Sequence, residues 1–518
     1  MARLPYHSWT RASQVLVAGC AAAVCSLPAG AAPRAPGGGG DEKPVFTRAE
    51  LEDALRTGRP DKRRVAVARL AEIGDRPAWE LVLGALADAE PEVADEAQIA
   101  LGQANDARLL ADLAGTQGLR ARDAHLRLRA AEALGRASLE LPAEWLVRAL
   151  DPSDPELCRT LLWSIERLHD AKKLGGDKEK AVSACARLVA GRGEGGVCGA
   201  ALCALEKLDH FAAQELLGGA LADPDPALRC GALLVCARAP EQERLDASRA
   251  MLADPDARVR AAAIENLEGL ESRAAALALV EHMQREPRAR LRWEILGWLR
   301  ARSGLEHGFD PDAWRAWAET VEGRVHTGEA RAGGPLGDTH VAFAGLNVLS
   351  DRVCFLIDLS GSLWQSKVGD RTRKEIVDEQ LRNVLQALPP ETLFNVIPYT
   401  SEPDPWEKRL VPATKANVAR AIKDFERRHQ TGRGNFYDAA RAALVDPEVD
   451  TLCVLTDGVP TGGQHWNMAL MIEELVEHAR FRRAAYDSVL VDAPKRRQKD
   501  WATLAERTGG RSIVVKPE

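Results

Sequence analysis

The sequence predicts two structured domains of different class, an all-α array of repeats followed by an α/β domain with a doubly wound, mainly parallel sheet. An apolar anchor recurs eight times between residues 46 and 324, and short apolar runs alternate with helical stretches after residue 341. The length of 518 residues is also too great for one ordinary core. We therefore place the repeats at 46–324, a linker at 325–340 and the α/β domain at 341–518.

The recurring motif is one face of a helix. The anchors follow one another in steps of 31, 33, 31, 40, 31, 31 and 32 residues, and such a nearly fixed period is typical of a solenoid. Six of the eight positions four residues before the anchor are Ala, and seven of the eight positions eight residues before it are apolar. This spacing forms a stripe whose central Ala lets neighbouring helices approach closely. The anchors are Leu70, Leu101, Leu134, Ile165, Leu205, Cys236, Leu267 and Leu299.

The turns before these helices share a second pattern. Asp and often Pro precede the helix, as in Asp223-Pro224 and Asp254-Pro255, and both residues favour a helix start. Arg recurs seven residues before the anchor, for example at Arg229. The combined pattern resembles HEAT-like repeats of the short class found in bacterial lyase-like and scaffold proteins. The resemblance implies a curved rod with a concave face suited to protein binding.

Two irregular segments interrupt or end the array. The 40-residue step contains the charged stretch 172–180, which we expect to be an exposed loop insertion. After the last repeat, Asp310-Pro311 predicts a helix start that places Trp314 and Trp317 on one face. We expect this pair to cover the open end of the repeat core, because terminal repeats need a cap.

The α/β domain is predicted from alternating segments. Apolar runs of strand length alternate with stretches of helical period at 414–428, 436–444 and 466–483, which indicates βαβ units and a parallel sheet. The apolar runs are Val353–Ile357, Leu393–Ile397, Leu452–Leu455, Val489–Val491 and Ile513–Val515.

Polar side chains follow two of these strands. Asp358, Ser360 and Ser362 come directly after the first, and Asp457 follows the strand at 452–455. The carboxyl ends of parallel strands meet at one edge of the sheet, where ligands bind in open α/β folds. Carboxylates and hydroxyls together suit a hard cation such as Mg²⁺. The sequence therefore predicts a metal site at this edge.

The Asp-x-Ser-x-Ser segment and the Thr-Asp-Gly segment resemble the von Willebrand factor A family and its metal-ion-dependent adhesion site. The resemblance covers roughly residue 341 to the C-terminus. It implies that Asp358, Ser360, Ser362 and Asp457 hold or orient Mg²⁺ or Mn²⁺, partly through water, and that the ion captures an acidic residue of a partner protein. It also implies a central parallel sheet flanked by helices.

One position departs from the family pattern. Gly434 stands where the family has a Thr, and Thr431 lies three residues out of register. A water molecule can fill the gap because Mg²⁺ readily retains water ligands. The alternative is a domain that keeps the acids as loop-capping groups and binds no ion.

Enzymatic alternatives have less support. Ser360 or Ser362 with His465 and Asp457 could form a hydrolytic triad, but no nucleophile-elbow motif is present, and we expect His465 to be an exposed loop residue. An acid–base pair of Asp358 and Asp457 explains the neighbouring hydroxyls less well than a shared cation does. A phosphate-binding Gly-rich loop is also missing. We expect no enzymatic activity.

The N-terminus resembles a targeting segment. Arg3 and Arg11 precede an apolar stretch at 13–27, and Ala29-Gly30-Ala31 offers a cleavage site, so we predict a signal peptide at 1–31 and a flexible linker at 32–45. Cys20 lies in a sequence that resembles a lipoprotein box, which would make it a lipid anchor instead. The stretch is too short and Ala-rich for a good membrane span. We expect an exported protein in the periplasm or cell envelope.

The net charge and the cysteine spacing exclude further classes of function. The net charge of −7 argues against nucleic-acid binding. The ten cysteines include no CxxC pair, so we expect buried thiols rather than a zinc motif. The sequence predicts an exported, non-enzymatic scaffold with a metal-dependent protein-binding domain and a second binding surface on the repeats. The alternatives are a lyase-like enzyme or enzyme subunit that uses the repeats, and a structural envelope protein with a vestigial metal site.

Overall fold

The computed structural model describes residues 46–191, 193, 196–322, 341–361, 367–368, 370–429 and 431–515. The predicted signal peptide with Cys20, the linkers at 32–45 and 325–340, and Ser362 lie outside the described residues. Met1–Thr47 form one unit and Arg48–Glu518 the other. Among the described residues, no helix is both long and apolar enough to cross a membrane.

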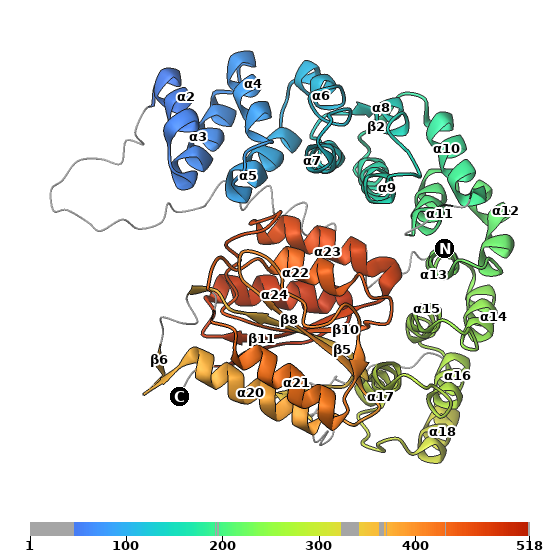
Figure 1. Cartoon of the computed structure of the whole chain (residues 1–518). Helices are drawn as coiled ribbons and strands as arrows, with labels where there is room; N and C mark the ends of the chain where they lie inside the picture. Colours follow the sequence, from blue (N-terminus) through green and yellow to red (C-terminus); the bar gives the residue numbers. More distant parts are fainter. Residues whose placement is uncertain are drawn as a thin grey trace. The chain divides into compact units, whose positions relative to one another are not determined.

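The first part of this unit is an array of helices (Figure 1). All eight predicted anchors are buried, with exposed fractions of 0–2%, and each lies on a different helix of the set α3, α5, α7, α9, α11, α13, α15 and α17. The predicted solenoid is therefore confirmed. The helices are α2 (Arg48–Thr57), α3 (Pro60–Ile73), α4 (Arg76–Ala85), α5 (Pro91–Gly102), α6 (Ala107–Leu113), α7 (Ala124–Gly135), α8 (Ala143–Val147), α9 (Pro155–Asp170), α10 (Lys178–Ala190), α11 (Val197–Leu208), α12 (His210–Leu221), α13 (Pro226–Cys236), α14 (Glu241–Met251), α15 (Ala257–Glu268), α16 (Arg273–Met283), α17 (Ala289–Ser303) and α18 (Pro311–Thr320).

The recurring arginine links successive repeats. In four repeats its guanidinium reaches an acidic side chain 25 to 27 residues further along the chain, just before the next anchor helix. These pairs fix the spacing between neighbouring repeats and explain why Arg recurs at a constant distance from the anchor. They are Arg63–Asp88 at 2.8 Å, Arg127–Asp154 at 3.0 Å, Arg229–Asp254 at 2.7 Å and Arg260–Glu286 at 2.8 Å.

The segment 172–180 is the predicted insertion, with some local structure. Leu174 and Gly175 form a short strand, β2 (Leu174–Gly175), that pairs in parallel with β1 (Leu141–Pro142). Lys178 already begins α10, where Asp177 caps the helix by accepting from the backbone N–H of Lys180. The segment is thus an exposed or half-buried connection, as predicted, to which the short strand pairing and the start of α10 add local order that composition does not reveal.

The last repeat is covered as predicted. Trp314 is fully buried on α18 and its indole Nε1 donates to the Gly308 carbonyl at 2.8 Å. The Trp317 ring lies edge-on to Trp314 with centroids 5.9 Å apart. The pair belongs to the hydrophobic core of the repeats, which supports its role as a cap.

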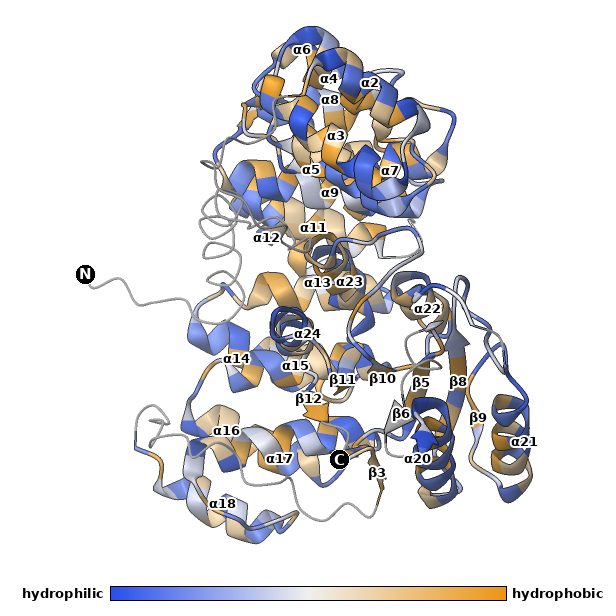
Figure 2. Ribbon diagram, turned by 90° about the vertical axis from the view of Figure 1, so that its left-hand side faces the viewer, coloured by the Kyte–Doolittle hydropathy of each residue, from blue (hydrophilic) through white to orange (hydrophobic). Residues whose placement is uncertain are grey.

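The second part is a six-stranded sheet with helices on both faces (Figure 2). The strand order is β12-β11-β10-β5-β8-β9, and every neighbouring pair is parallel except β8 with β9. The predicted fold class is confirmed. The strands are β5 (Arg352–Asp358), β8 (Leu393–Tyr399), β9 (Val411–Pro412), β10 (Thr451–Thr456), β11 (Ala485–Val491) and β12 (Ser512–Val515).

Two hydrophobic cores lie on the two faces of this sheet. One packs side chains of β5, β8, β10 and β11 against α22 (Phe436–Ala443), α23 (Met468–Arg482) and α24 (Lys495–Thr508). The other packs the alternate side chains against α20 (Arg373–Ala387) and α21 (Lys415–Glu426). Alternation of side chains along each strand sends consecutive residues to opposite cores. The eight described cysteines are all buried and form no disulfide with one another, as expected.

The repeat array curves around the α/β domain (Figure 1). Phe481 at the end of α23 is 3% exposed and belongs to the hydrophobic core of the repeats, where it packs close to Gly199 of α11. Ion pairs across the same boundary include Arg480–Glu166 at 2.9 Å and Arg167–Glu473 at 3.0 Å. The predicted concave surface is therefore largely occupied by the protein's own α/β domain, which the repeat pattern alone gave no means of predicting.

Candidate functional site

Asp358 lies at the carboxyl end of β5, in the centre of the sheet. Its carboxylate is 1% exposed and accepts a hydrogen bond from the Ser360 backbone N–H at 2.8 Å on Oδ1. Thr456, the last residue of the neighbouring strand β10, donates from Oγ1 to Oδ2 at 2.7 Å. The parallel pairing of β5 and β10 thus brings together two segments almost a hundred residues apart, as the sequence predicted.

The surroundings of Asp358 disfavour its charge. Burial and the nearby carboxylate of Asp457 raise the pKa of Asp358 to about 6. The Tyr399 side chain beside it is also buried, and burial together with Asp358 raises the tyrosine pKa well above its ordinary value. Asp358, buried and held by neutral donors beside a second acid, carries negative charge when ionised that a cation would compensate.

Ser360 and Asp457 sit on the loops that flank Asp358. Ser360 is 6% exposed and forms an isolated parallel bridge with Gly432, and the next residue, Gly361, donates to the Gly432 carbonyl at 3.2 Å. Asp457 is half-buried, and its Oδ1 accepts from the Val459 backbone N–H at 3.2 Å. The described members of the predicted set therefore lie at one edge of the sheet.

Gly434 lies next to Asp358 and has room for a Cβ, which would also lie 3.5 Å from the Val459 carbonyl oxygen. A Cβ at this position would lie 3.6 and 3.7 Å from the two carboxylate oxygens, which is ordinary contact distance. The Cβ of a Thr would therefore fit here, beside Asp358. In this chain the backbone N–H of Gly434 donates a hydrogen bond to Thr461 Oγ1 at 2.7 Å. The described oxygen atoms and the space at Gly434 fit a hard divalent cation with water ligands.

Two threonines belong to this site that sequence reasoning missed. Thr456 fixes the Asp358 carboxylate, and Thr461 fixes the loop that carries Gly434. Thr456 is the first residue of the Thr-Asp-Gly segment, so its position at the strand end was a usable signal. Thr461 follows in the same loop, but nothing in the spacing indicates its contact with residue 434. Thr431, considered as a substitute ligand, is exposed.

Basic side chains flank the loop that carries Asp457. The indole of Trp501 on α24 donates to the Gly458 carbonyl at 3.2 Å, which fixes this loop against the helix. The first turns of α24 then lie beside it, with Lys495, Arg496 and Lys499 exposed to solvent. The positive charge next to the site favours the approach of an acidic ligand.

His465 occupies a different place from the one expected. It is fully buried at the junction with the repeats, 2.9 Å from Asp95 of α5 through Nδ1 and 2.8 Å from Glu474 of α23 through Nε2. Asp95 also accepts from the backbone N–H groups of Trp466 and Asn467 at 2.7 and 2.6 Å. The predicted exposed loop position was wrong because the covering residues come from a distant helix. These partners also remove His465 from the hydrolytic triad considered above.

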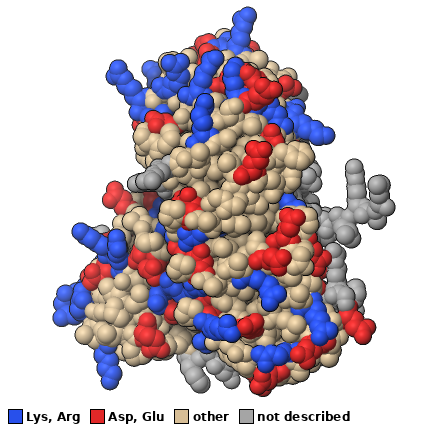
Figure 3. Space-filling model, turned by 90° about the vertical axis from the view of Figure 1, so that its right-hand side faces the viewer, with Lys and Arg blue, Asp and Glu red and all other residues tan. Residues whose placement is uncertain are grey.

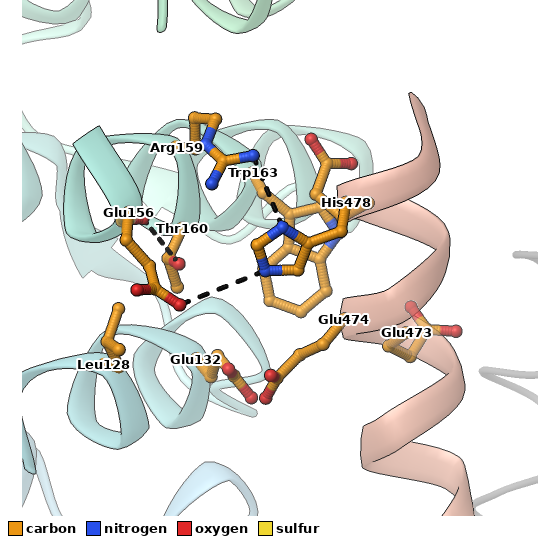
Figure 4. Close-up of a pocket in the computed structure, with 10 residues that line it drawn as sticks. Leu128, Glu132, Glu156, Arg159, Thr160, Trp163, Glu473, Glu474 and His478 are labelled. Carbon is orange, nitrogen blue, oxygen red and sulfur yellow. Dashed lines mark hydrogen bonds and ion pairs between the residues drawn. The ribbon is translucent and has the colours of Figure 1, made fainter. Parts of the chain in front are cut away.

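The charged side chains at the junction shift one another's pKa values. Burial lowers the pKa of His465, but Glu474 and Asp95 outweigh burial and raise it to about 10. Burial works against ionised Asp95 and Glu474, yet His465 holds the pKa of both below the ordinary range. Glu132 of α7 responds in the opposite sense, since burial and the nearby Glu474 raise its pKa well above the usual value. Figure 4 shows the side chains of Glu132 and Glu474 facing each other.

Comparisons with known proteins find similarities to parts of this chain. A family model described as HEAT repeats matches residues 213–299. Inter alpha-trypsin inhibitor, heavy chain 4 from Mus musculus is 31% identical over 137 residues, which are 24% of this chain and 14% of that protein. Inter-alpha-trypsin inhibitor heavy chain H2 from Homo sapiens is 31% identical over 131 residues, or 23% of this chain and 13% of that protein. The chain thus spans only 13–14% of the length of these relatives.

Among solved structures, the chain is similar to von Willebrand factor type A from Catenulispora acidiphila. The sequence identity is 16% and the TM-score 0.26, and the match covers 32% of this chain and 38% of that one.

Proposed function

We propose that this protein, which carries HEAT-like repeats followed by a von Willebrand factor A domain, is an exported, non-enzymatic scaffold. Its A domain would bind a partner protein through a divalent cation at the edge of the sheet. Asp358, Ser360, Ser362 and Asp457 would hold or orient Mg²⁺ or Mn²⁺, partly through water. The bound ion supplies an electrophilic position that an acidic residue of the partner can occupy.

The observation that carries this proposal is the environment of Asp358. Its carboxylate is buried, accepts hydrogen bonds from a backbone N–H and a hydroxyl, and lies next to a second acid and to the space at Gly434. A loop-capping acid would need no second carboxylate nearby. A cation would relieve the repulsion between Asp358 and Asp457 and would use the space at Gly434 for a water ligand.

The acidic character of the partner follows from the charges around the site. The site supplies few carboxylates of its own, so the ion would retain part of its positive charge. Lys495, Arg496 and Lys499 on the adjoining helix α24 are exposed and add to the positive potential. A partner that presents Asp or Glu would satisfy the ion and these side chains together.

The repeats would have two roles. Their inner helices hold the A domain, so partner binding by the repeats would use the outer side. There Phe211 on α12 is 81% exposed, and the helix has only one acidic residue, Glu215. Figure 3 shows an area with few charged side chains on this side of the unit. An exposed apolar area of this kind suits contact with another protein.

The proposal is tested by titrating Mg²⁺ and Mn²⁺ into the full chain by calorimetry, with Asp358→Asn as the site variant. Asparagine keeps the size of the side chain but removes its charge, so the fold should persist while cation affinity falls by about a hundredfold or more. Display of random acidic and neutral peptides, with Mn²⁺ or with a chelator, then tests the preference for an acidic ligand.

Asp492→Asn is the matched control. Asp492 follows β11, adopts a positive φ of 54° that asparagine tolerates, and pairs with Arg373 at 3.2 Å without belonging to the predicted set. This variant should bind the cation like the unmodified chain. Equal affinities of the Asp358→Asn variant and the unmodified chain would contradict the proposed site. Binding of peptides that does not depend on the cation would contradict the proposed mechanism.

A further inference from the structure

Three side chains from distant parts of the sequence meet at the junction of the repeats and the A domain. Glu132 comes from α7, Glu474 from α23, and His465 from the loop before α23. One ligand atom of each lies within 4.8 Å of the other two. Among the described residues, this is the group of His, Cys, Asp and Glu side chains whose spacing could hold a metal ion. It lies in the domain boundary, apart from the sheet-edge residues discussed above.

The orientation of His465 is set from behind by Asp95. Asp95 already accepts from Arg129 at 2.7 Å and from two backbone N–H groups, so it is an ionised acceptor for the Nδ1–H of His465. This hydrogen bond directs Nε2 toward Glu474 and Glu132. A carboxylate behind the imidazole is the arrangement that orients metal-binding histidines in proteins.

The atoms that face the centre of the group are incompletely satisfied. Nε2 of His465 and Oε1 of Glu474 lie 2.8 Å apart, yet neither atom has a hydrogen-bonding partner of acceptable geometry among the described residues. Both atoms are inaccessible to solvent. Oε2 of Glu132 accepts from Gln98 at 2.6 Å and from Arg136 at 3.2 Å, while its carboxylate faces that of Glu474 (Figure 4). Two buried carboxylates that face each other share a proton or hold a cation between them, and the directed Nε2 of His465 completes a ligand set for a cation.

A small cavity adjoins the group and supplies room for a further ligand. Its volume is about 30 Å³, and Glu132 and Glu474 form part of its lining together with Leu128 and Trp163 (Figure 4). A space of this size accommodates a water molecule when polar groups are close. The protein side chains thus offer one nitrogen and two oxygen ligands, and the cavity, which Glu132 and Glu474 line and His465 does not, offers room for water on the side of the carboxylates.

Another buried carboxylate at the same boundary lacks these features. Glu166 is 4% exposed and pairs with Arg480 at 2.9 Å and with Lys207 at 3.2 Å. Two protein cations compensate this carboxylate, and no histidine nitrogen is directed at it in the contacts that the structure describes. Glu166 therefore belongs to a buried ion-pair cluster, and it serves as the reference for the group of Glu132, His465 and Glu474.

We propose that Glu132, His465 and Glu474 bind one transition-metal ion of the Zn²⁺ class, with water as the fourth ligand, and that the ion joins the repeats to the A domain. One imidazole with two carboxylates suits Zn²⁺ in tetrahedral coordination, whereas Mg²⁺ prefers an all-oxygen octahedral set. The site is independent of Asp358. Failure of the sheet-edge proposal would leave it untouched.

The test uses the full chain with Asp358→Asn, so that the sheet-edge residues do not contribute to the count of ions. The protein is stripped with a chelator, loaded with ZnSO₄ and freed of unbound metal, and its zinc content is measured by mass spectrometry. We expect one tightly held ion per chain. X-ray absorption at the zinc edge should show a single imidazole ligand, which the sheet-edge residues cannot supply.

Glu132→Gln and His465→Gln are the site variants, and Glu166→Gln is the matched control. Glutamine at 132 keeps the size of the side chain and the contact with Gln98, so this variant is expected to fold even if His465→Gln does not. Both site variants should lose the bound ion, and the control should retain it. Zinc content far below one ion per chain, or equal content in the Glu132→Gln variant and the control, would overturn the proposal and leave a metal-free ionic junction.

Discussion

The carboxylates at the edge of the sheet and those at the junction with the repeats are held in different surroundings. Asp358 receives hydrogen bonds from a backbone N–H and from the hydroxyl of Thr456, and Gly434 beside it has room for a Cβ. Asp95 is enclosed by Arg129, His465 and two backbone N–H groups. The first environment leaves negative charge for a ligand to compensate. The second uses the protein's own cations to hold two domains together.

The largest expected effect is a loss of stability when Asp95 is removed from the junction. Asp95→Ala removes the acceptor for Arg129, His465 and two backbone N–H groups and leaves a buried guanidinium without its carboxylate. Loss of one partner from a buried pair costs about 3–5 kcal/mol, so we expect the free energy of unfolding to fall by about 4 kcal/mol. Denaturation in urea measures this value and shows whether the repeats and the A domain then unfold separately.

Asp106→Ala is the control for this variant. Asp106 caps α6 through the backbone N–H groups of Arg108 and Leu109 and has no part in the junction. Loss of such a cap costs about 1 kcal/mol. Equal losses in the two variants would mean that the junction contributes no more to stability than a surface cap.

The second prediction uses the opposite pKa shifts of the two aspartates. The pKa of Asp358 is raised to about 6 in the folded chain, above the value of about 4 in an unfolded one. The folded state therefore binds its proton more tightly, and the stability that this provides is present below pH 4 and lost as the pH rises through 6. Without a cation, ionised Asp358 should cost up to about 3 kcal/mol at pH 7.

Asp358→Asn should consequently stabilise the chelator-treated protein at pH 7 and have little effect near pH 4. Saturating Mg²⁺ should reduce the difference at pH 7, because the cation compensates the ionised carboxylate. Asp95 has a lowered pKa, so its contribution changes in the opposite sense and is lost as the pH falls. Urea denaturation across this pH range measures both trends. Equal stability of Asp358→Asn and the unmodified chain at pH 7 would contradict the unfavourable environment assigned to Asp358.

The contrast between the two environments also explains what could be predicted from the sequence. The sheet-edge residues follow two apolar strands, and the parallel pairing of β5 with β10 brings any such residues together. The eight anchors follow from helical period alone. These features depend on local spacing, and local spacing is visible in a single chain.

The junction depends on how two domains pack, which local spacing does not encode. Asp95 and His465 are 370 residues apart, and neither lies in a pattern that distinguishes it from a surface residue. The predicted exposure of His465 was wrong for this reason. For the same reason, the sequence does not predict that the α/β domain occupies the concave face. Phe481 lies on α23, and nothing in its sequence neighbourhood indicates that it packs into the core of the repeats.

The third prediction concerns the affinity of the sheet-edge site for Mg²⁺. Gly434→Thr places a hydroxyl beside Asp358, and the added Cβ meets the carboxylate oxygens at ordinary contact distance. One additional oxygen ligand should tighten Mg²⁺ binding by about tenfold, equivalent to ~1.4 kcal/mol. Calorimetric titration measures the change. Gly434→Ala adds the Cβ without the hydroxyl and should leave the affinity unaltered, so an equal gain in both variants would show that the hydroxyl is not a ligand.

The smallest expected effect concerns an exposed ion pair between the loop at the sheet edge and the repeats. Arg433 precedes Gly434 and pairs with Glu90 of the repeats at 2.6 Å, and its side chain is 48% exposed. Exposed pairs contribute about 0–1 kcal/mol, because water screens the charges and both side chains lose freedom. Arg433→Ala should therefore lower the free energy of unfolding by less than about 1 kcal/mol, and added salt should reduce the difference further. A loss as large as that of Asp95→Ala would show that partial exposure does not weaken contacts across this boundary, and the distinction between enclosed and open charges would then fail.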